Sequence, residues 1–194
     1  MKYIRFMIFC LLSLSASCRY DILNNPEHKL IKNFSSRARK EAGLISWSYG
    51  INQSLLRDYP SNALVGDFKV IYALRKTQEN VVSVDEARCL IISVVESFLR
   101  DINTNQKIRK KLAAFPFPSN RMSIYIVFVD ENDIGLGNGG VQKVYVDNDK
   151  IRYVRYEIYE YIKPVPFGKH FVFHEEVYSK AFDIVKEQGR LREL

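Results

Sequence analysis

The sequence predicts an α+β domain in which a mainly antiparallel sheet of about five strands packs against two or three helices. Apolar residues make up 47% of the 194 residues, which is enough to build a hydrophobic core. Some segments repeat apolar residues at helical spacing, whereas others alternate apolar and polar residues as strands do. These segments follow the order helix, two strands, helix, three or four strands, helix, which is typical of α+β domains.

The first helix is expected over 26–42. Pro26 suits its first turn, where an N–H group would have no helical partner, and Gly43 ends it. Its apolar face consists of Leu30, Ile31, Phe34 and Ala38. Two strands are expected next, over 44–51 and 68–74, because apolar and polar residues alternate there.

The second helix is expected over 83–102. Ser83 and Glu86 predict a capping box, in which each side chain bonds the backbone of the other residue. One face is apolar (Ala87, Ile91, Val94, Val95, Phe98 and Ile102), and the other carries Glu86, Ser93, Ser97 and Arg100. Helical spacing resumes over 106–114 and ends at 115–118, where prolines lack the N–H that a helix needs.

The following segments are expected to form strands. Both faces of 124–129 are apolar, which predicts a central strand covered on two sides. The segments 141–146 and 151–162 flank Asp147-Asn148-Asp149-Lys150, which predicts a hairpin. A short strand is expected over 170–173.

A last helix is expected to begin at His174 and to end at Gly189. Glu175 and Glu176 are interpreted as first-turn acids that interact favourably with the helix dipole. These acids, with His170 and His174, also invite a metal interpretation. Residues four apart on a strand are about 13 Å apart, too far to share a metal, so we expect no metal site.

The first residues resemble an export signal in their charge and hydropathy. Lys2 and Arg5 provide a positive start, 6–14 is apolar apart from Ser13, and 15–17 consists of small residues. This pattern is typical of a secretory signal peptide. The apolar run is far shorter than the roughly 20 residues that span a bilayer. No later segment reaches that length, so the mature chain is not expected to cross a membrane.

The end of this leader, Ser15-Ala16-Ser17-Cys18, resembles the lipobox of bacterial lipoproteins. The resemblance covers only the first 18 residues. It implies that residues 1–17 are removed as a signal peptide and that the Cys18 thiol receives diacylglycerol, with palmitate-type acyl chains anchoring the protein. The remaining chain then divides into a tether over 18–25 and a single α+β domain over 26–194.

Ordinary secretion is the alternative to lipidation. Leu14 lies four residues before the cysteine, whereas the lipobox prefers it three before, and Ser15 takes that place. Ser15 and Ser17 also suit the general signal peptidase, which would leave Cys18 as a free thiol. Acyl chains contribute about 0.8 kcal/mol per buried CH2, so several chains would hold a lipidated Cys18 firmly to the membrane.

The charge of the chain bears on its partners. The formal net charge is +7, and removal of Lys2 and Arg5 with the leader lowers it to +5. Basic residues gather in 28–40, 100–111 and 180–192. Because export separates the chain from nucleic acid, we expect its partners to be the membrane and an envelope protein, cell-wall polymer or anionic lipid. A solvated basic surface without a partner is the alternative.

Three sequence patterns resemble functional sites but are better explained as ordinary structural segments. The glycine loop 135–140 precedes a strand-like segment, whereas a nucleotide loop needs a helix. The acidic segment 130–133 lacks the spacing of a calcium loop. Cys89 lies on the polar side of its helix with no histidine nearby in sequence, which indicates an inert thiol. We therefore expect no catalytic residue, metal or cofactor.

Arg88 and a group of tyrosines are the candidate ligand contacts. Arg88 falls within the apolar face of the helix 83–102, where a charge needs a partner. A structural salt bridge is the leading interpretation, and contact with a carboxylate or phosphate of a ligand is the alternative. Tyrosine suits wet recognition surfaces for sugars or peptides. Several tyrosines crowd the hairpin strands, and some must face the core: Tyr145, Tyr153, Tyr156, Tyr159 and Tyr161.

Taken together, these features predict an exported lipoprotein with a non-catalytic binding or structural envelope domain. It would be anchored on the outer side of the cytoplasmic membrane or at the outer membrane. The alternative is an envelope hydrolase whose site is assembled only in the fold, with contributions from His170, His174, Glu175 or Glu176. A pocket joining a histidine, a carboxylate and a nucleophile favours the enzyme, whereas a continuous Tyr/Arg patch favours the binder.

Overall fold

The computed structural model describes residues 26–52, 69–77, 80–110, 112, 115–131, 139–162 and 165–194. The expected leader and Cys18 lie outside these residues, as do 135–138 of the glycine segment and 132–133 of the acidic segment. Side chains are described for the same residues except 47–52, 69–73, 75, 156–162 and 165–168. The side chains of Tyr156, Tyr159 and Tyr161 are therefore outside the described part of the chain.

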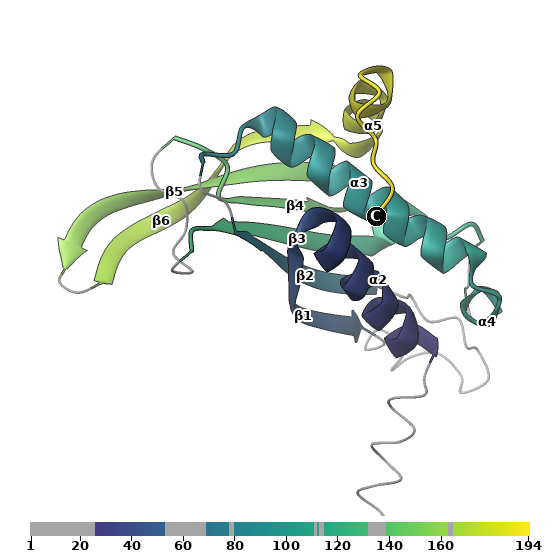
Figure 1. Cartoon of the computed structure of the whole chain (residues 1–194). Coiled ribbons are helices and arrows are strands. Elements are labelled where there is room, and N and C mark those ends of the chain that lie inside the picture. The colour runs from purple at the N-terminus through teal and green to yellow at the C-terminus, as the bar shows by residue number, and fades with distance from the viewer. Residues whose placement is uncertain are drawn as a thin grey trace, which may run out of the picture.

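The described chain forms a six-stranded sheet with helices packed beside it (Figure 1). The strands are β1 (Leu44–Asn52), β2 (Lys69–Thr77), β3 (Met122–Val129), β4 (Lys143–Asp147), β5 (Lys150–Ile162) and β6 (Val165–Val177). The helices are α2 (Pro26–Ala42), α3 (Val84–Thr104), α4 (Gln106–Arg109) and α5 (Tyr178–Glu187), with a 3-10 turn at Ser119–Arg121. The α+β prediction is confirmed, with six strands rather than about five.

The strands lie in the sheet in their order along the chain. Each pairs antiparallel with its neighbour except β2 and β3, which are parallel. A parallel pair needs a crossover connection, and α3 lies in the connection between β2 and β3. The prediction of a mainly antiparallel sheet is therefore confirmed.

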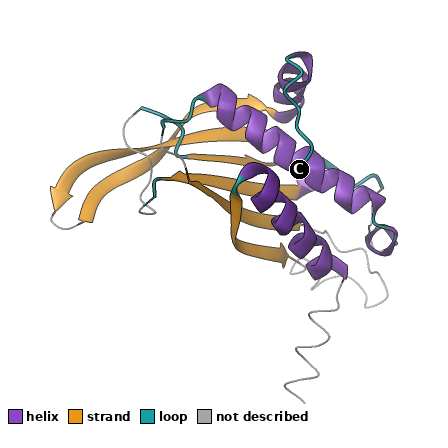
Figure 2. Cartoon of the chain, viewed as in Figure 1, coloured by secondary structure: helices purple, strands orange, loops and turns teal. Residues whose placement is uncertain are grey.

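The helices α2 and α3 cover one face of the sheet, as Figure 2 shows. The apolar face expected for α2 is buried in the core, and Phe34 meets Phe98 of α3 edge to face with ring centroids 4.8 Å apart. The capping box of Ser83 and Glu86 begins α3 as expected. Alternate strand residues complete this core, among them Ile126 and Val144, which are fully buried.

The expected hairpin joins β4 and β5. Asp147 pairs with Lys150 in the antiparallel register, so Asn148 and Asp149 form a two-residue loop. Both loop residues have positive φ, 50° and 58°, as the tight turns that match the twist of a hairpin require. Asn and Asp tolerate this left-handed conformation better than most residues, which explains why this turn is recognisable in the sequence.

The last part of the chain differs from its prediction. β6 is a strand of 13 residues rather than the short strand 170–173, and α5 begins at Tyr178 rather than at His174. Pairing with β5 continues to Val177, opposite Lys150, and this pairing keeps the preceding residues extended. Glu175 and Glu176 are therefore strand residues, and the interpretation of them as first-turn helix acids is wrong. In the described helices, no run is long and apolar enough to cross a bilayer.

Candidate functional site

The two faces of the sheet differ sharply in their side chains. Successive strand residues point to opposite faces, so Tyr125 and Tyr145 lie on the face opposite the buried Ile126 and Val144. We call this second face the helix-free face, because α2 and α3, the long helices among the described residues, lie on the other one (Figure 2). Its described residues in β3, β4 and β5 include aromatic and cationic side chains that are only half-buried.

An aromatic and cationic cluster lies at the centre of the helix-free face. Tyr125 and Tyr145 are cross-strand partners, and their rings stack with centroids 5.3 Å apart. The ammonium of Lys143 lies 4.9 Å from the ring centroid of Tyr125 and 5.2 Å from that of Tyr145. Partial burial lowers the pKa of Lys143. We call Tyr125, Lys143, Tyr145 and Arg152 the aromatic cluster.

Arg152 extends this cluster towards the edge of the sheet. Its guanidinium carbon lies 5.8 Å from the ring centroid of Tyr145, its cross-strand partner. Glu175 of β6 accepts hydrogen bonds from Arg152 Nε at 2.5 Å and Lys150 Nζ at 2.6 Å. The bonds from Lys150 and Arg152 lower the pKa of Glu175. Arg152 is thus neutralised by Glu175, whereas Lys143 has no ion pair within the described part of the chain.

A different polar network lies on the helix-covered side. Arg88 of α3 donates from Nε to Glu176 Oε1 at 2.8 Å and also bonds Asp85. The buried Tyr153 donates its hydroxyl to the same oxygen of Glu176. The side chains of Arg88 and Glu176 are only 11% and 13% exposed. The expected salt bridge of Arg88 is therefore present and ties α3 to β5 and β6.

The titration of this network follows from its burial. Burial raises the pKa of the Tyr153 hydroxyl, and the hydrogen bond to the Glu176 carboxylate raises it further. Burial by itself would lower the pKa of Arg88, but the bond and charge of Glu176 outweigh burial and raise it. Tyr153 thus lies in the core and anchors a carboxylate there, away from the helix-free face.

The histidines and acids of β6 do not converge on a metal. His170 and His174 stand opposite Tyr156 and Tyr153 in the register of β5. The ring of His174 lies 5.2 Å from that of Tyr153. Among the described residues, no group of three or more His, Cys, Asp and Glu side chains is placed to hold a metal ion. The two acids that follow His174 are engaged on opposite faces of the sheet.

Cys89 lies beside a pocket of about 280 Å³ between α2, α3 and the residues after α5. Burial raises the pKa of its thiol, although the nearby charge of Arg190 acts in the opposite direction. A raised pKa leaves less of the nucleophilic thiolate at neutral pH. The surroundings of the thiol therefore do not activate it as a nucleophile. The pocket is also lined by the cationic side chains of Lys76, Arg190 and Arg192.

Comparison with known proteins gives no relative. The chain matches no protein family, no curated protein and no solved structure. A functional assignment therefore depends on the side chains and their contacts.

Sequence reasoning found part of these arrangements. Tyr145 is one of the hairpin tyrosines that the sequence indicates. Tyr125 is not indicated, because its strand is apolar on both faces. The hairpin loop at 148–149 fixes the register of β4 against β5, so it could reveal the pairing of Tyr145 with Arg152. Tyr125 pairs with Tyr145 through the separate register of β3 against β4. The partner of Arg88 was missed, since Glu176 was assigned to a helix.

Proposed function

We propose that the chain is an exported lipoprotein, anchored through Cys18, whose domain binds an anionic cell-wall polymer on the helix-free face. The aromatic cluster is the single observation that carries the binding part of this proposal. The leader sequence supports the export part of this proposal. Its residues lie outside those that the structure describes.

The chemistry of the cluster supports this choice of ligand. Tyrosine rings offer an apolar face for the C–H side of a sugar ring and a hydroxyl for its oxygens. The ammonium of Lys143 lies next to two such rings and has no carboxylate partner in the described chain. A carboxylate or phosphate carried by the sugar can pair with this cation while the ring contacts Tyr145.

The position of the cluster supports a long ligand rather than a small one. It lies on a sheet surface that crosses three strands, from Tyr125 on β3 through Tyr145 on β4 to Arg152 on β5. A polymer can follow this row and contact several side chains at once. Each contact then needs only modest strength, since cation–π and aromatic contacts contribute about 0.5–1 kcal/mol at exposed sites.

Cosedimentation with insoluble cell-wall polymer tests the binding proposal. Lys143→Gln removes the ammonium that lies beside both rings and is expected to lower the bound fraction several-fold. Tyr145→Ala is expected to lower it further by removing the stacked ring. Lys107→Gln is the matched control, because it removes the same charge from an exposed position on α4. Equal retention of all four proteins on the polymer contradicts the proposed site.

Labelling of cells with radioactive palmitate tests the anchoring proposal. The wild-type chain is expected to incorporate label and to fractionate with membranes. Cys18→Ser is expected to lose both the label and the membrane association. A native product that is recovered from the cytosol with Met1 still attached would overturn the export part, and an unlabelled product beginning at Cys18 would overturn the lipid part.

A further inference from the structure

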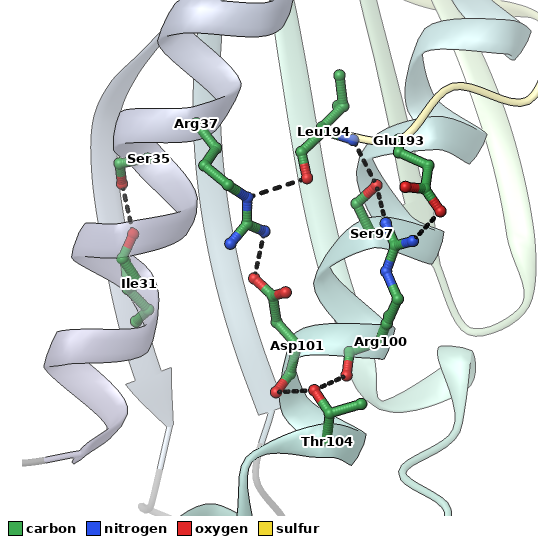
Figure 3. A network of polar contacts seen from close by, with 9 residues as sticks. All are labelled: Ile31, Ser35, Arg37, Ser97, Arg100, Asp101, Thr104, Glu193 and Leu194. Atoms are coloured by element: carbon green, nitrogen blue, oxygen red, sulfur yellow. Dashed lines mark hydrogen bonds and ion pairs between the residues drawn. The ribbon is translucent and has the colours of Figure 1, made fainter.

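The residues that follow α5 run back along α3 towards α2 (Figure 1), and Figure 3 shows how Glu193 and Leu194 are held. We call residues 188–194 the strap. Ser93 and Ser97, one turn apart on α3, accept hydrogen bonds from the backbone N–H groups of Arg192 at 3.1 Å and Leu194 at 3.0 Å. Both serines are 1% exposed. The sequence placed them on the polar face of the helix, and the strap explains why they are buried.

Side chains of both helices fix the end of the strap (Figure 3). Arg37 of α2 donates from Nε to the backbone carbonyl of Leu194 at 3.0 Å and pairs with Asp101 of α3 at 2.5 Å. Arg100 of α3 forms an ion pair with Glu193. The Leu194 side chain is 7% exposed and belongs to the hydrophobic core. The strap is therefore packed as part of the domain.

The strap forms one wall of the pocket of about 280 Å³ beside Cys89. Arg190, Arg192 and Leu194 of the strap line it, opposite the ends of α2 and β2 and the first half of α3. Lys76 of β2 supplies a third cation, and Phe128 supplies an apolar floor. We call this site the strap pocket. It lies on the helix-covered side, away from the aromatic cluster.

The cations of the strap pocket are only partly neutralised. Lys76 donates to the backbone carbonyl of Ala42 at 3.0 Å. Burial lowers the pKa of Lys76, and the neighbouring charge of Arg192 lowers it further. The Arg192 guanidinium makes no hydrogen bond or ion pair with the part of the chain that the structure describes. Two cations therefore line one space, which Glu41 and Glu86 also line.

The two glutamate side chains at the pocket have other partners. Glu86 accepts from the N–H and the hydroxyl of Ser83, at 2.9 and 2.8 Å, as part of the α3 capping box. Glu41 lies 3.6 Å from the ammonium of Lys40 on the surface of α2. An anion that enters the pocket can thus pair with Arg192 and Lys76 without displacing an existing ion pair.

We propose that the strap pocket binds a small organic anion, a carboxylate or phosphate group on a short apolar body, and that docking of the strap on Ser93 and Ser97 assembles this site. The anionic group pairs with Arg192 and Lys76. The apolar body packs on Phe128 and its apolar neighbours Val82 and Leu90. Ser97 does not line the pocket, so it acts as a positioning residue through the backbone of the strap.

NMR titration of the purified chain with hexanoate tests this site, with hexanamide as the neutral probe of the same shape and inorganic phosphate as the bare anion. Hexanoate is expected to shift the amide signals of the strap and of the first half of α3, and hexanamide to bind at least tenfold more weakly. Arg192→Gln is expected to weaken hexanoate about tenfold or more, as expected when a hydrogen bond to a charged group is lost.

Variants outside the pocket test the assembly by the strap. Ser97→Ala removes the acceptor of the Leu194 N–H and is expected to weaken hexanoate several-fold, although no atom of Ser97 touches the pocket. Ser35→Ala is the matched control, because the Ser35 hydroxyl donates to the carbonyl of Ile31 at 2.7 Å within α2 (Figure 3), and Ser35 does not line the strap pocket. Lys76→Gln removes a pocket cation without changing any residue of the strap. It therefore tests the contribution of positive charge to hexanoate binding even if Ser97→Ala fails to fold.

Two results would overturn the inference. One is a chain that binds neither hexanoate nor phosphate, or that binds hexanamide equally well, since the pocket is then no anion site. The other is unchanged hexanoate affinity in Ser97→Ala, since the strap then plays no part in assembling the site. Neither result bears on polymer binding at the aromatic cluster, which lies on the opposite face of the sheet.

Discussion

Glu175 and Glu176 are neighbours on β6, yet they occupy opposite faces of the sheet and very different environments. Glu176 is nearly buried and bonds Arg88 and Tyr153 on the helix-covered side. Glu175 is exposed and pairs with Lys150 and Arg152 on the helix-free face. Similar residues thus stabilise the fold on one face and shape a surface on the other. The comparison teaches that burial, more than residue type, separates charges that hold the fold together from charges that shape a surface.

The largest effect that tests this comparison is expected from Arg88→Met. It leaves the Glu176 carboxylate enclosed without its cation, and breaking a buried pair in this way costs about 3–5 kcal/mol of unfolding free energy. Arg152→Met is the matched change on the helix-free face and is expected to cost about 0–1 kcal/mol, as exposed pairs do. Urea unfolding measures both. Equal losses of unfolding free energy in the two variants would contradict the difference in energetic role between the two faces of the sheet.

A smaller effect is expected from Tyr153→Phe. The change removes one hydroxyl that donates to the Glu176 carboxylate but keeps the buried ring. Hydrogen bonds to charged groups contribute about 1.5–3 kcal/mol, so the unfolding free energy should fall by that amount. Tyr145→Phe, on the helix-free face, is the control and should leave thermal and urea unfolding almost unchanged. A loss in the control as large as in Tyr153→Phe would be inconsistent with the account.

The smallest effect concerns pH and Glu175. The folded-state pKa of Glu175 is lowered by Lys150 and Arg152, so its ion pairs stabilise the fold above the ordinary pKa of a glutamate. This contribution is lost as the pH falls through the lowered folded-state pKa. Glu175→Gln should therefore be slightly less stable than the wild type at pH 7, and the difference should shrink at pH 3. A difference that grows on acidification would contradict this assignment.

Local chemistry explains what the sequence could predict. The capping box of Ser83 and Glu86, the loop of Asn148 and Asp149, and the apolar face of α2 are all set by residues within a few positions of one another. These features gave the α+β class, the element order and the hairpin. Each of them is present in the structure.

Long-range pairing explains what the sequence could not predict. β6 remains extended to Val177 because β5 pairs with it, although His174 to Val177 suit the start of a helix by local pattern. Ser93 and Ser97 match an exposed helix face until the strap, about a hundred residues later, covers them. The partners of Arg88 and Tyr125 likewise depend on register between distant segments.

Backbone NMR of the domain with a carboxylated oligosaccharide tests the proposed function most directly. The account predicts that amide shifts concentrate at Tyr125 and over 143–145 and 152, that a neutral glucan of equal length gives much smaller shifts, and that Lys143→Gln abolishes the difference. Shifts confined to the helix-covered side, or identical shifts with the neutral glucan, would contradict recognition of an anionic polymer by the helix-free face.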